Sequence, residues 1–338
     1  MFKKIKILFF VAVFFLAGLA IGRWGLGQPR SSAEPLTSED SYQELRSGGY
    51  KFINPLLECE ITSAEMVSVS DIQSKVAKLV ETKLANNSAS NISVYFRDLN
   101  NGPWFGLNEK EKFSPASLLK IPVLIAFLKK AESDPQILKQ EITFSGFSAD
   151  NQDPASYFPP GQKIEVGKTY SVEDLLNRMI VYSDNDAKNL LVDNIDPNFM
   201  NQVYEDSGIQ LPTVQTGDYI NVRDYASIFR ILFNASYLER QMSEYALELL
   251  SKSEFKEGLV AGISAKIEVA HKFGERIITS ADGSGISQLH DCGIIYYPGH
   301  PYLLCVMTRG KMFNGLAGII KDISGLVYKE VDDRYGTN

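Results

Sequence analysis

Three short motifs place reactive side chains in a fixed order along this chain. They are Ser-Leu-Leu-Lys at 117–120, Ser-Asp-Asn at 183–185 and Lys-Phe-Gly at 272–274. A serine hydroxyl is a poor nucleophile until a neighbouring group takes its proton. Together the motifs supply such a hydroxyl, an amine, a second hydroxyl, a carboxamide and a cation. They therefore predict nucleophilic catalysis by a serine that has a lysine as its base.

Ser117 and Lys120 are three positions apart, so they share one face of a predicted helix. Burial lowers the pKa of a lysine because the charged form loses its hydration, and a neutral Lys120 can then act as base. Ser117 also lies at the positive end of the helix dipole, where its own N–H can donate to an oxyanion. A serine at this point can instead be a helix cap, although Ser114, just before Pro115, fits that role better.

The second motif allows two interpretations. In the functional one, Ser183 relays a proton toward the leaving group, and Asn185 orients Lys120 or holds a substrate amide. In the structural one, Ser183 and Asp186 form a capping box before an apolar helix.

The third motif predicts a substrate-binding edge. Lys272 would place a cation near a substrate carboxylate, Gly274 would continue the segment, and the backbone N–H of Glu275 would be a second oxyanion donor. A lysine on an edge strand is also an ordinary defence against aggregation.

The sequence gives little support for a histidine-based catalytic site or for a metal site. The only histidines are His271, His290 and His300, and they form no metal-binding or Ser-His-Asp pattern. We expect no cofactor and no metal.

Hydrophobic periodicity outlines the domain that must position these motifs. Strands are predicted at 92–96, 104–107, 269–273, 293–297 and 302–307, and helices at 72–84, 115–128, 172–180, 224–233, 242–250 and 316–327. The order predicts an α/β fold plus an all-α lobe: an antiparallel sheet is covered by terminal helices, and a helical subdomain at about 130–255 is inserted into it. A substrate cleft is expected between the two lobes.

The N-terminus has the pattern of an export segment. Three lysines precede an apolar run from Ile7 to Gly22, and Gly18 and Ala20 are spaced like a peptidase site. Residues 1–26 are therefore a signal peptide or a membrane anchor, and the body lies on the extracytoplasmic face. Residues 27–65 are a polar spacer, and the domain covers 66–335.

The charge of the body argues against a nucleic-acid partner. Five of the 34 Lys and Arg residues, and none of the 41 Asp and Glu residues, lie in the first 30 positions, which leaves −12 on the rest. An acidic body has no electrostatic footprint for DNA or RNA.

The three cysteines leave their pairing open. Cys292 and Cys305 lie on two strand-like runs that can form a hairpin, whereas Cys59 lies in the spacer. A disulfide suits an oxidising compartment, but all three can equally be small buried hydrophobic residues.

With these motifs, the sequence resembles the class A β-lactamases, within the wider group of penicillin-recognising serine enzymes. The resemblance spans about 66 to 330 and includes the strand pair at 291–296 and 306–310. It implies a two-lobed fold, Ser117 as nucleophile, and Lys120, Ser183, Asn185 and Lys272 as site residues. It also implies β-lactam or peptidoglycan-peptide substrates, with the membrane as a partner through the N-terminal segment.

Two departures from the family pattern bear on activity. The third motif has Phe273 where the family has Thr or Ser, so a hydroxyl that contacts the substrate carboxylate is missing. No Glu-x-x-Leu-Asn segment lies between 194 and 221, and the family uses that Glu to activate the deacylating water. Glu205, Asp206 and Asp218 are the acids near that stretch.

These departures leave three functions open. The leading one is a serine hydrolase acylated at Ser117 by β-lactams or related amides, with slow deacylation. The alternatives are a D,D-peptidase or transpeptidase acting on peptidoglycan, and a catalytically inactive, anchored wall-binding protein.

Overall fold

A computed structural model describes residues 41–62, 68–100, 102–147, 156–211, 217–279 and 285–336. The chain divides into two compact units, Gln43–Glu60 with Met66–Asn338, and Met1–Tyr42 with Ile61–Glu65. The predicted signal or anchor at 1–26 lies outside the described residues. Within the described ranges, no helix is both long and apolar enough to cross a membrane.

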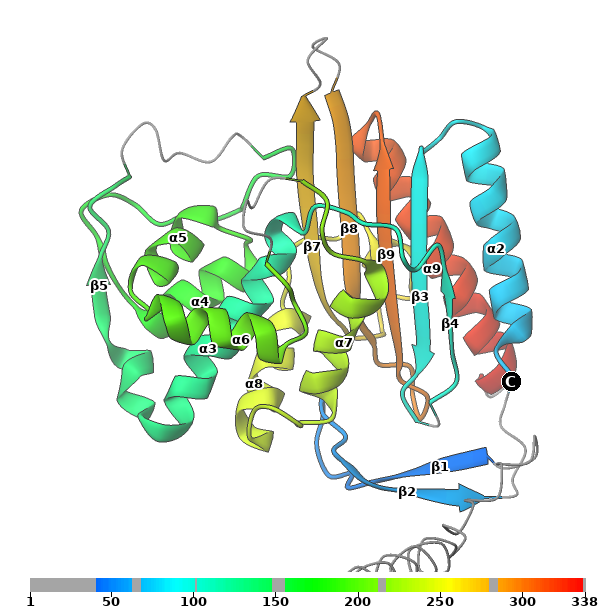
Figure 1. Ribbon diagram of the computed structural model, residues 1–338, viewed down its shortest axis with the longest axis horizontal. Coiled ribbons are helices and arrows are strands. Elements are labelled where there is room, and N and C mark those ends of the chain that lie inside the picture. Colours follow the sequence, from blue (N-terminus) through cyan, green and yellow to red (C-terminus); the bar gives the residue numbers. More distant parts are fainter. Residues whose placement is uncertain are drawn as a thin grey trace, which may run out of the picture. The chain divides into compact units, whose positions relative to one another are not determined.

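A five-stranded antiparallel sheet forms the centre of this unit (Figure 1). Its order is β4-β3-β9-β8-β7, and β7 is an edge strand. The bounds are β3 Asn91–Asp98, β4 Trp104–Leu107, β7 Val269–Thr279, β8 Gly285–Ile295 and β9 Tyr302–Gly310. The order brings the N-terminal strands beside the C-terminal ones, as expected for a sheet with a large insertion.

Two terminal helices cover one face of the sheet. They are α2, Ser70–Ala85, and α9, Phe313–Tyr335. Val76 of α2 and Ile320 of α9 are fully buried in one apolar cluster with Val94 and Val306 of the sheet. Burial of such aliphatic side chains contributes about 1.5–3 kcal/mol each.

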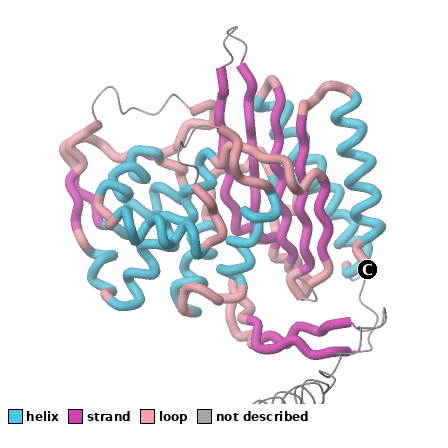
Figure 2. Tube along the Cα trace, viewed as in Figure 1, coloured by secondary structure: helices cyan, strands magenta, loops and turns pink. Residues whose placement is uncertain are grey.

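The inserted lobe lies on the other side of the sheet and is mainly helical (Figure 2). Its α-helices are α3 Lys120–Ser133, α4 Val172–Val181, α5 Asn185–Asp193, α6 Pro197–Asp206, α7 Val222–Phe233 and α8 Arg240–Ser251. The expectation of an all-α lobe misses a small sheet, in which β5, Glu141–Thr143, pairs with β6, Thr169–Ser171. These two segments are too short for their alternation to be read from the sequence.

The described part of the spacer contains two strands, β1 Ser41–Arg46 and β2 Leu56–Thr62, which pair with each other. Between them, Phe52 and Ile53 are buried in the apolar core of the helical lobe. The carboxylate of Glu244 on α8 accepts hydrogen bonds from both of their N–H groups.

The pairing of the cysteines is resolved. Cys292 on β8 lies directly opposite Cys305 on β9, and the two form a disulfide in the middle of the sheet. Cys59 is free and exposed.

Candidate active site

Ser117 lies on a tight turn that joins the sheet to the buried helix α3. The turn is a 3₁₀ helix, Ala116–Leu119, which runs directly into Lys120. Ala116 has φ of 47°, a left-handed conformation that costs an L-residue about 1–2 kcal/mol. Ser117 itself is half-buried. A strained backbone immediately before a candidate nucleophile is a common feature of functional sites.

The prediction that Ser114 caps this helix is wrong. No side chain caps the turn, and the Ser114 hydroxyl instead accepts a hydrogen bond from Arg276 at 3.0 Å. The reason is that the chain enters through an extended segment, in which Phe113 pairs with Ile220, and the helix starts only at Ala116.

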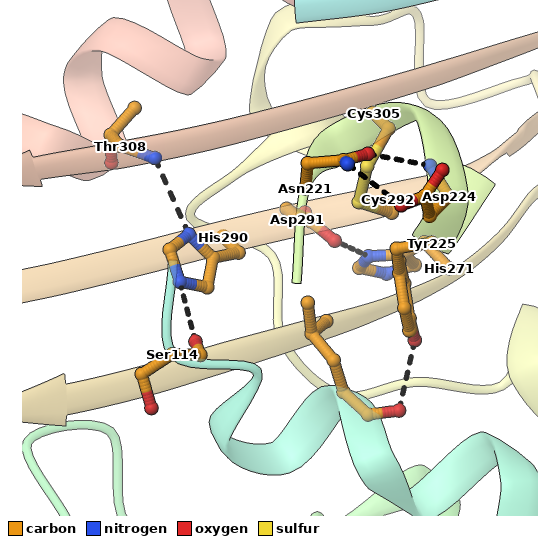
Figure 3. Close-up of a disulfide and its surroundings, with 11 residues drawn as sticks. Ser114, Asn221, Asp224, Tyr225, His271, His290, Asp291, Cys292, Cys305 and Thr308 are labelled. Carbon is orange, nitrogen blue, oxygen red and sulfur yellow. Dashed lines mark hydrogen bonds and ion pairs between the residues drawn. A yellow bond between two sulfur atoms is a disulfide. The ribbon is translucent and has the colours of Figure 1, made fainter. Parts of the chain in front are cut away.

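Buried side chains of β8 hold the backbone of this segment. The Ser114 N–H donates to Gln288 Oε1 at 3.0 Å, and the Ser114 carbonyl lies 3.0 Å from His290 Nε2 (Figure 3). Because His290 Nδ1 accepts from the Thr308 N–H, the proton of the ring is on Nε2. Burial lowers the pKa of His290 to about 4, so the ring is neutral near pH 7.

Edge strand β7 and helix α7 hold the turn from two further directions. A Cβ on Gly274 would lie 2.9 Å from the Pro115 carbonyl oxygen and 3.2 Å from the Leu118 nitrogen, so only glycine permits this close approach. From α7, the hydroxyl of buried Tyr225 donates to the Leu118 carbonyl at 3.0 Å. The approach of Gly274 brings Glu275, the predicted oxyanion donor, next to the nucleophile turn.

Lys120 meets the second motif inside the protein. Its side chain is 2% exposed, and its Nζ donates to the Ser183 carbonyl at 2.6 Å, the Ser183 hydroxyl at 3.0 Å and Asn185 Oδ1 at 2.6 Å. These contacts give a buried amino group the polar partners that it needs. They also bring the first and second motifs together, as the sequence predicts.

Lys272 joins the same hydroxyl from the sheet. Its Nζ lies 2.8 Å from Ser183 Oγ and 4.3 Å from the centre of the Phe273 ring. Complete burial lowers the pKa of Lys272 to about 7, although the charges of Asp291 and Glu275 oppose this shift. Asp291 is itself buried and lies 2.8 Å from His271 (Figure 3). Ser183 is thus the point at which all three motifs meet.

The capping-box interpretation of Ser183 is wrong. The cap of α5 is Asp184, whose Oδ1 accepts from the Asp186 N–H and whose Oδ2 accepts from the Ile164 N–H. Ser183 has φ of 59°, outside the helical region, and this conformation leaves its hydroxyl to the two lysines. Burial raises the pKa of the Asp184 carboxyl.

Glu275 contributes a carboxylate to this region as well as a backbone N–H. Both carboxylate oxygens lie 3.2 Å from the backbone nitrogen of Phe158, which is in the loop between β5 and β6 and donates its N–H to them. The side chain is half-buried, and burial raises its pKa although Lys120 and Lys272 oppose the shift. The oxyanion role of its N–H stays a prediction.

Phe273 belongs to an aromatic cluster beside the site, which we define as Phe158, Phe255, Phe273 and Phe313. The rings of Phe273 and Phe255 stack with centroids 4.0 Å apart, and Phe158 meets both rings edge-on. Phe273 is 6% exposed. The residue that replaces the family's hydroxyl therefore fills apolar space beside Lys272.

The surroundings of the three acidic residues near the absent Glu-x-x-Leu-Asn segment do not mark any of them as the base for deacylation. Asp218 accepts from Gln288 at 2.8 Å and forms an ion pair with Arg309 at 2.6 Å. Glu205 is exposed on α6, and Asp206 accepts from Gln202 and Tyr237. The chain between α6 and α7 runs only from 207 to 221.

Several residues that shape the site are not apparent from the sequence. Gln288, His290 and Tyr225 act on the nucleophile turn through contacts more than 100 positions away in the chain. No local motif marks them. Asp184 could have been found, because an Asp immediately before a helix is a frequent cap.

The comparisons agree with the motifs. The model of the beta-lactamase enzyme family matches residues 71–331. Among solved structures, a mutant of PBP-A, in an acyl-enzyme complex with penicillin G, is 20% identical with a TM-score of 0.63, covering 78% of this chain and 97% of that one.

Two class A β-lactamases match to the same extent. The enzyme from Mycobacterium abscessus is 20% identical with a TM-score of 0.62, covering 77% of this chain and 99% of that one. The representative from Bacteroides cellulosilyticus is 19% identical with a TM-score of 0.64, covering 78% and 99%. At these identities the structures establish the fold, and the match over most of the chain establishes the family. The chain therefore belongs to the beta-lactamase enzyme family, whose serine-enzyme fold it shares with class A β-lactamases and PBP-A.

Proposed function

We propose that this protein is an acyl-serine enzyme that is acylated at Ser117 by β-lactams or related amides and is deacylated slowly. The observation that carries the proposal is the position of the Ser183 hydroxyl, 3.0 Å from Lys120 Nζ and 2.8 Å from Lys272 Nζ. A hydroxyl between two lysines is suited to carry a proton from the base to a leaving nitrogen.

The proposed acylation step uses residues of all three motifs. Ser117 Oγ attacks the amide carbon while Lys120, in its neutral form, takes the hydroxyl proton. The new O–C bond gives a tetrahedral oxyanion, and its donors are the N–H groups of Ser117 and Glu275. The C–N bond then breaks, and the proton passes from Lys120 through Ser183 to the nitrogen. Asn185 fixes Lys120 through its Oδ1 at 2.6 Å.

Slow deacylation follows from the surroundings of the nearby acids. A water that attacks the ester needs a positioned base, and Asp218 is already engaged by Gln288 and Arg309. Loss of such a base typically lowers a rate by about 10²–10⁴-fold. A D,D-peptidase or transpeptidase, which passes the acyl group to another acceptor, is favoured by the same observation. The PBP-A structure, solved as an acyl-enzyme with penicillin G, is consistent with both functions.

The proposal includes a location outside the cytoplasm. It rests on the basic and apolar segment at 1–26, which would direct export or anchor the chain. Protease treatment of intact cells that express the full chain tests the location, because only an exported domain is accessible.

Intact-mass analysis over time after addition of benzylpenicillin tests the activity. We expect a mass increase equal to one penicillin that persists for many minutes and maps to Ser117. Ser117→Ala should give no adduct, Lys120→Ala should slow acylation by about 10²-fold or more, and Lys120→Arg should not rescue it because arginine stays protonated. An adduct on another residue, or rapid turnover without accumulation, would reject the proposal.

A further inference from the structure

Lys272 is less suited to bind a carboxylate than its place in the motif suggests. Its Nζ has no exposed surface, since the residue is completely buried, and two sides of it are taken by Ser183 Oγ at 2.8 Å and the Phe273 ring at 4.3 Å. A carboxylate is best held by a charge-assisted bond from a cation together with further donors. At position 273 the donor is replaced by an aromatic ring.

A carboxylate of the protein itself already lies in this region. Glu275 follows Gly274 directly on the edge strand, three positions after Lys272. Its two oxygens are fixed by the N–H of Phe158, whose ring packs edge-on against Phe273 with centroids 6.2 Å apart. The contacts run from Lys272 to Phe273, from Phe273 to Phe158 and from Phe158 to Glu275.

Glu275 therefore adds a carboxylate to the edge strand that carries Lys272. The charge of Glu275 opposes the effect of burial on the pKa of Lys272, and the charge of Lys272 opposes the effect of burial on the pKa of Glu275, so this carboxylate offsets part of the field of the lysine. A second carboxylate brought beside Glu275 would be repelled.

We propose that Glu275 and Phe273 make this site select acyl donors that carry no free carboxylate beside the reacting carbonyl. The inference rests on the proposed acylation at Ser117 and names the substrate class of that site. Penicillins and peptides that end in a free carboxylate would be poor acyl donors, and their esters or amides would be better ones.

The test compares benzylpenicillin with its methyl ester, which share the reacting ring and differ in one charge. Intact-mass kinetics give the acylation rate constant at Ser117 for each compound. For the unmodified protein we expect the ester to react about tenfold faster or more. Glu275→Gln should raise the rate with the acid, relative to the rate with the ester, by about tenfold. Phe273→Thr should also raise the rate with the acid.

A matched control removes one carboxylate elsewhere. Glu81 is exposed on α2 and belongs to none of the three motifs, so Glu81→Gln should leave both rates unchanged. A ratio near one in the unmodified protein, or a faster acid, overturns the inference without the use of any variant, and Ser117 acylation then stands alone. No adduct with either compound overturns the proposed function and this inference with it.

Discussion

Lys272 and Ser183 are joined by a hydrogen bond of 2.8 Å between a fully buried amino group and a hydroxyl that Lys120 also contacts. One serine thus connects a lysine of the inserted lobe with a lysine of the sheet. The arrangement depends on the left-handed backbone of Ser183. Asp184 caps helix α5, and the Ser183 hydroxyl contacts the two lysines instead. The proposed proton path therefore depends on a backbone conformation as well as on a side chain.

Ser183→Ala should slow acylation of Ser117 by about 10²–10³-fold, because both lysines lose their shared partner and the leaving nitrogen loses its proton donor. The measurement is the single-turnover acylation rate by mass spectrometry. Ser74→Ala, at an exposed position of α2, is the control and should react like the unmodified protein. Acylation of Ser183→Ala at an unchanged rate would exclude the relay.

The low pKa of Lys272 predicts how stability depends on pH. The folded protein releases this proton near pH 7, whereas the unfolded chain keeps it up to about 10.5. Between these values the unfolded state binds more protons, so the contribution of this group to stability rises with pH. Lys272→Met cannot titrate.

The free energy of unfolding of both proteins, measured in denaturant from pH 6 to 9, tests this expectation. The difference should move in favour of the unmodified protein above pH 7, by up to about 1.4 kcal/mol per pH unit. A difference that is constant over this range would show that Lys272 stays charged.

His290 predicts a loss of stability in acid. Its pKa is lowered to about 4 in the folded protein, from an ordinary value of 6.5. Between these two values only the unfolded chain binds the proton, so stability falls as the pH falls from 6.5 toward 4. In His290→Gln this part of the acid sensitivity should disappear, as judged by melting temperature against pH. His300→Gln, near the surface against Tyr335, should retain it.

Gly274→Ala should damage the site through packing alone. The new methyl group would lie 2.9 Å from the Pro115 carbonyl oxygen and would push the nucleophile turn away from β7. Overpacking of this kind typically costs about 1–3 kcal/mol, and acylation should slow with it. Gly318→Ala on α9 is the matched control, because no atom lies within 4 Å of its added Cβ. That variant should be as active and at least as stable as the unmodified protein.

Asp218→Asn tests whether Asp218, in the loop between α6 and α7, contributes to stability or to the deacylation rate. The variant loses the ion pair with Arg309, which should lower stability by about 1 kcal/mol or less. If Asp218 is not the deacylation base, release of the acyl group should proceed within about twofold of the original rate. Arg309→Gln should cost more stability, because it also loses the ion pair with Glu111. A tenfold slower deacylation in Asp218→Asn alone would identify Asp218 as the missing base.

The sequence predicts the candidate site residues better than the contacts that position them. Short local motifs are enough to find Ser117, Lys120, Ser183 and Lys272. The periodicity of hydrophobic residues is enough to find most strands and helices. Each of these signals is contained within a short stretch of the chain. The partners of these residues are set by the fold. His290 contacts Ser114 although the two are far apart in the sequence, and the same is true of Glu275 and Phe158. The left-handed backbone of Ala116 could not be predicted from the sequence, because such a conformation is usually indicated by a glycine.

The Cys292–Cys305 disulfide has a practical consequence for anyone who purifies this enzyme. Recombinant material made in a reducing cytosol and material made in an oxidising compartment would differ by one covalent bond between adjacent central strands. His290 and Asp291 immediately precede Cys292, so the two preparations differ next to residues that hold the site. Rates compared between laboratories are therefore meaningful only when the thiol content of each sample is stated.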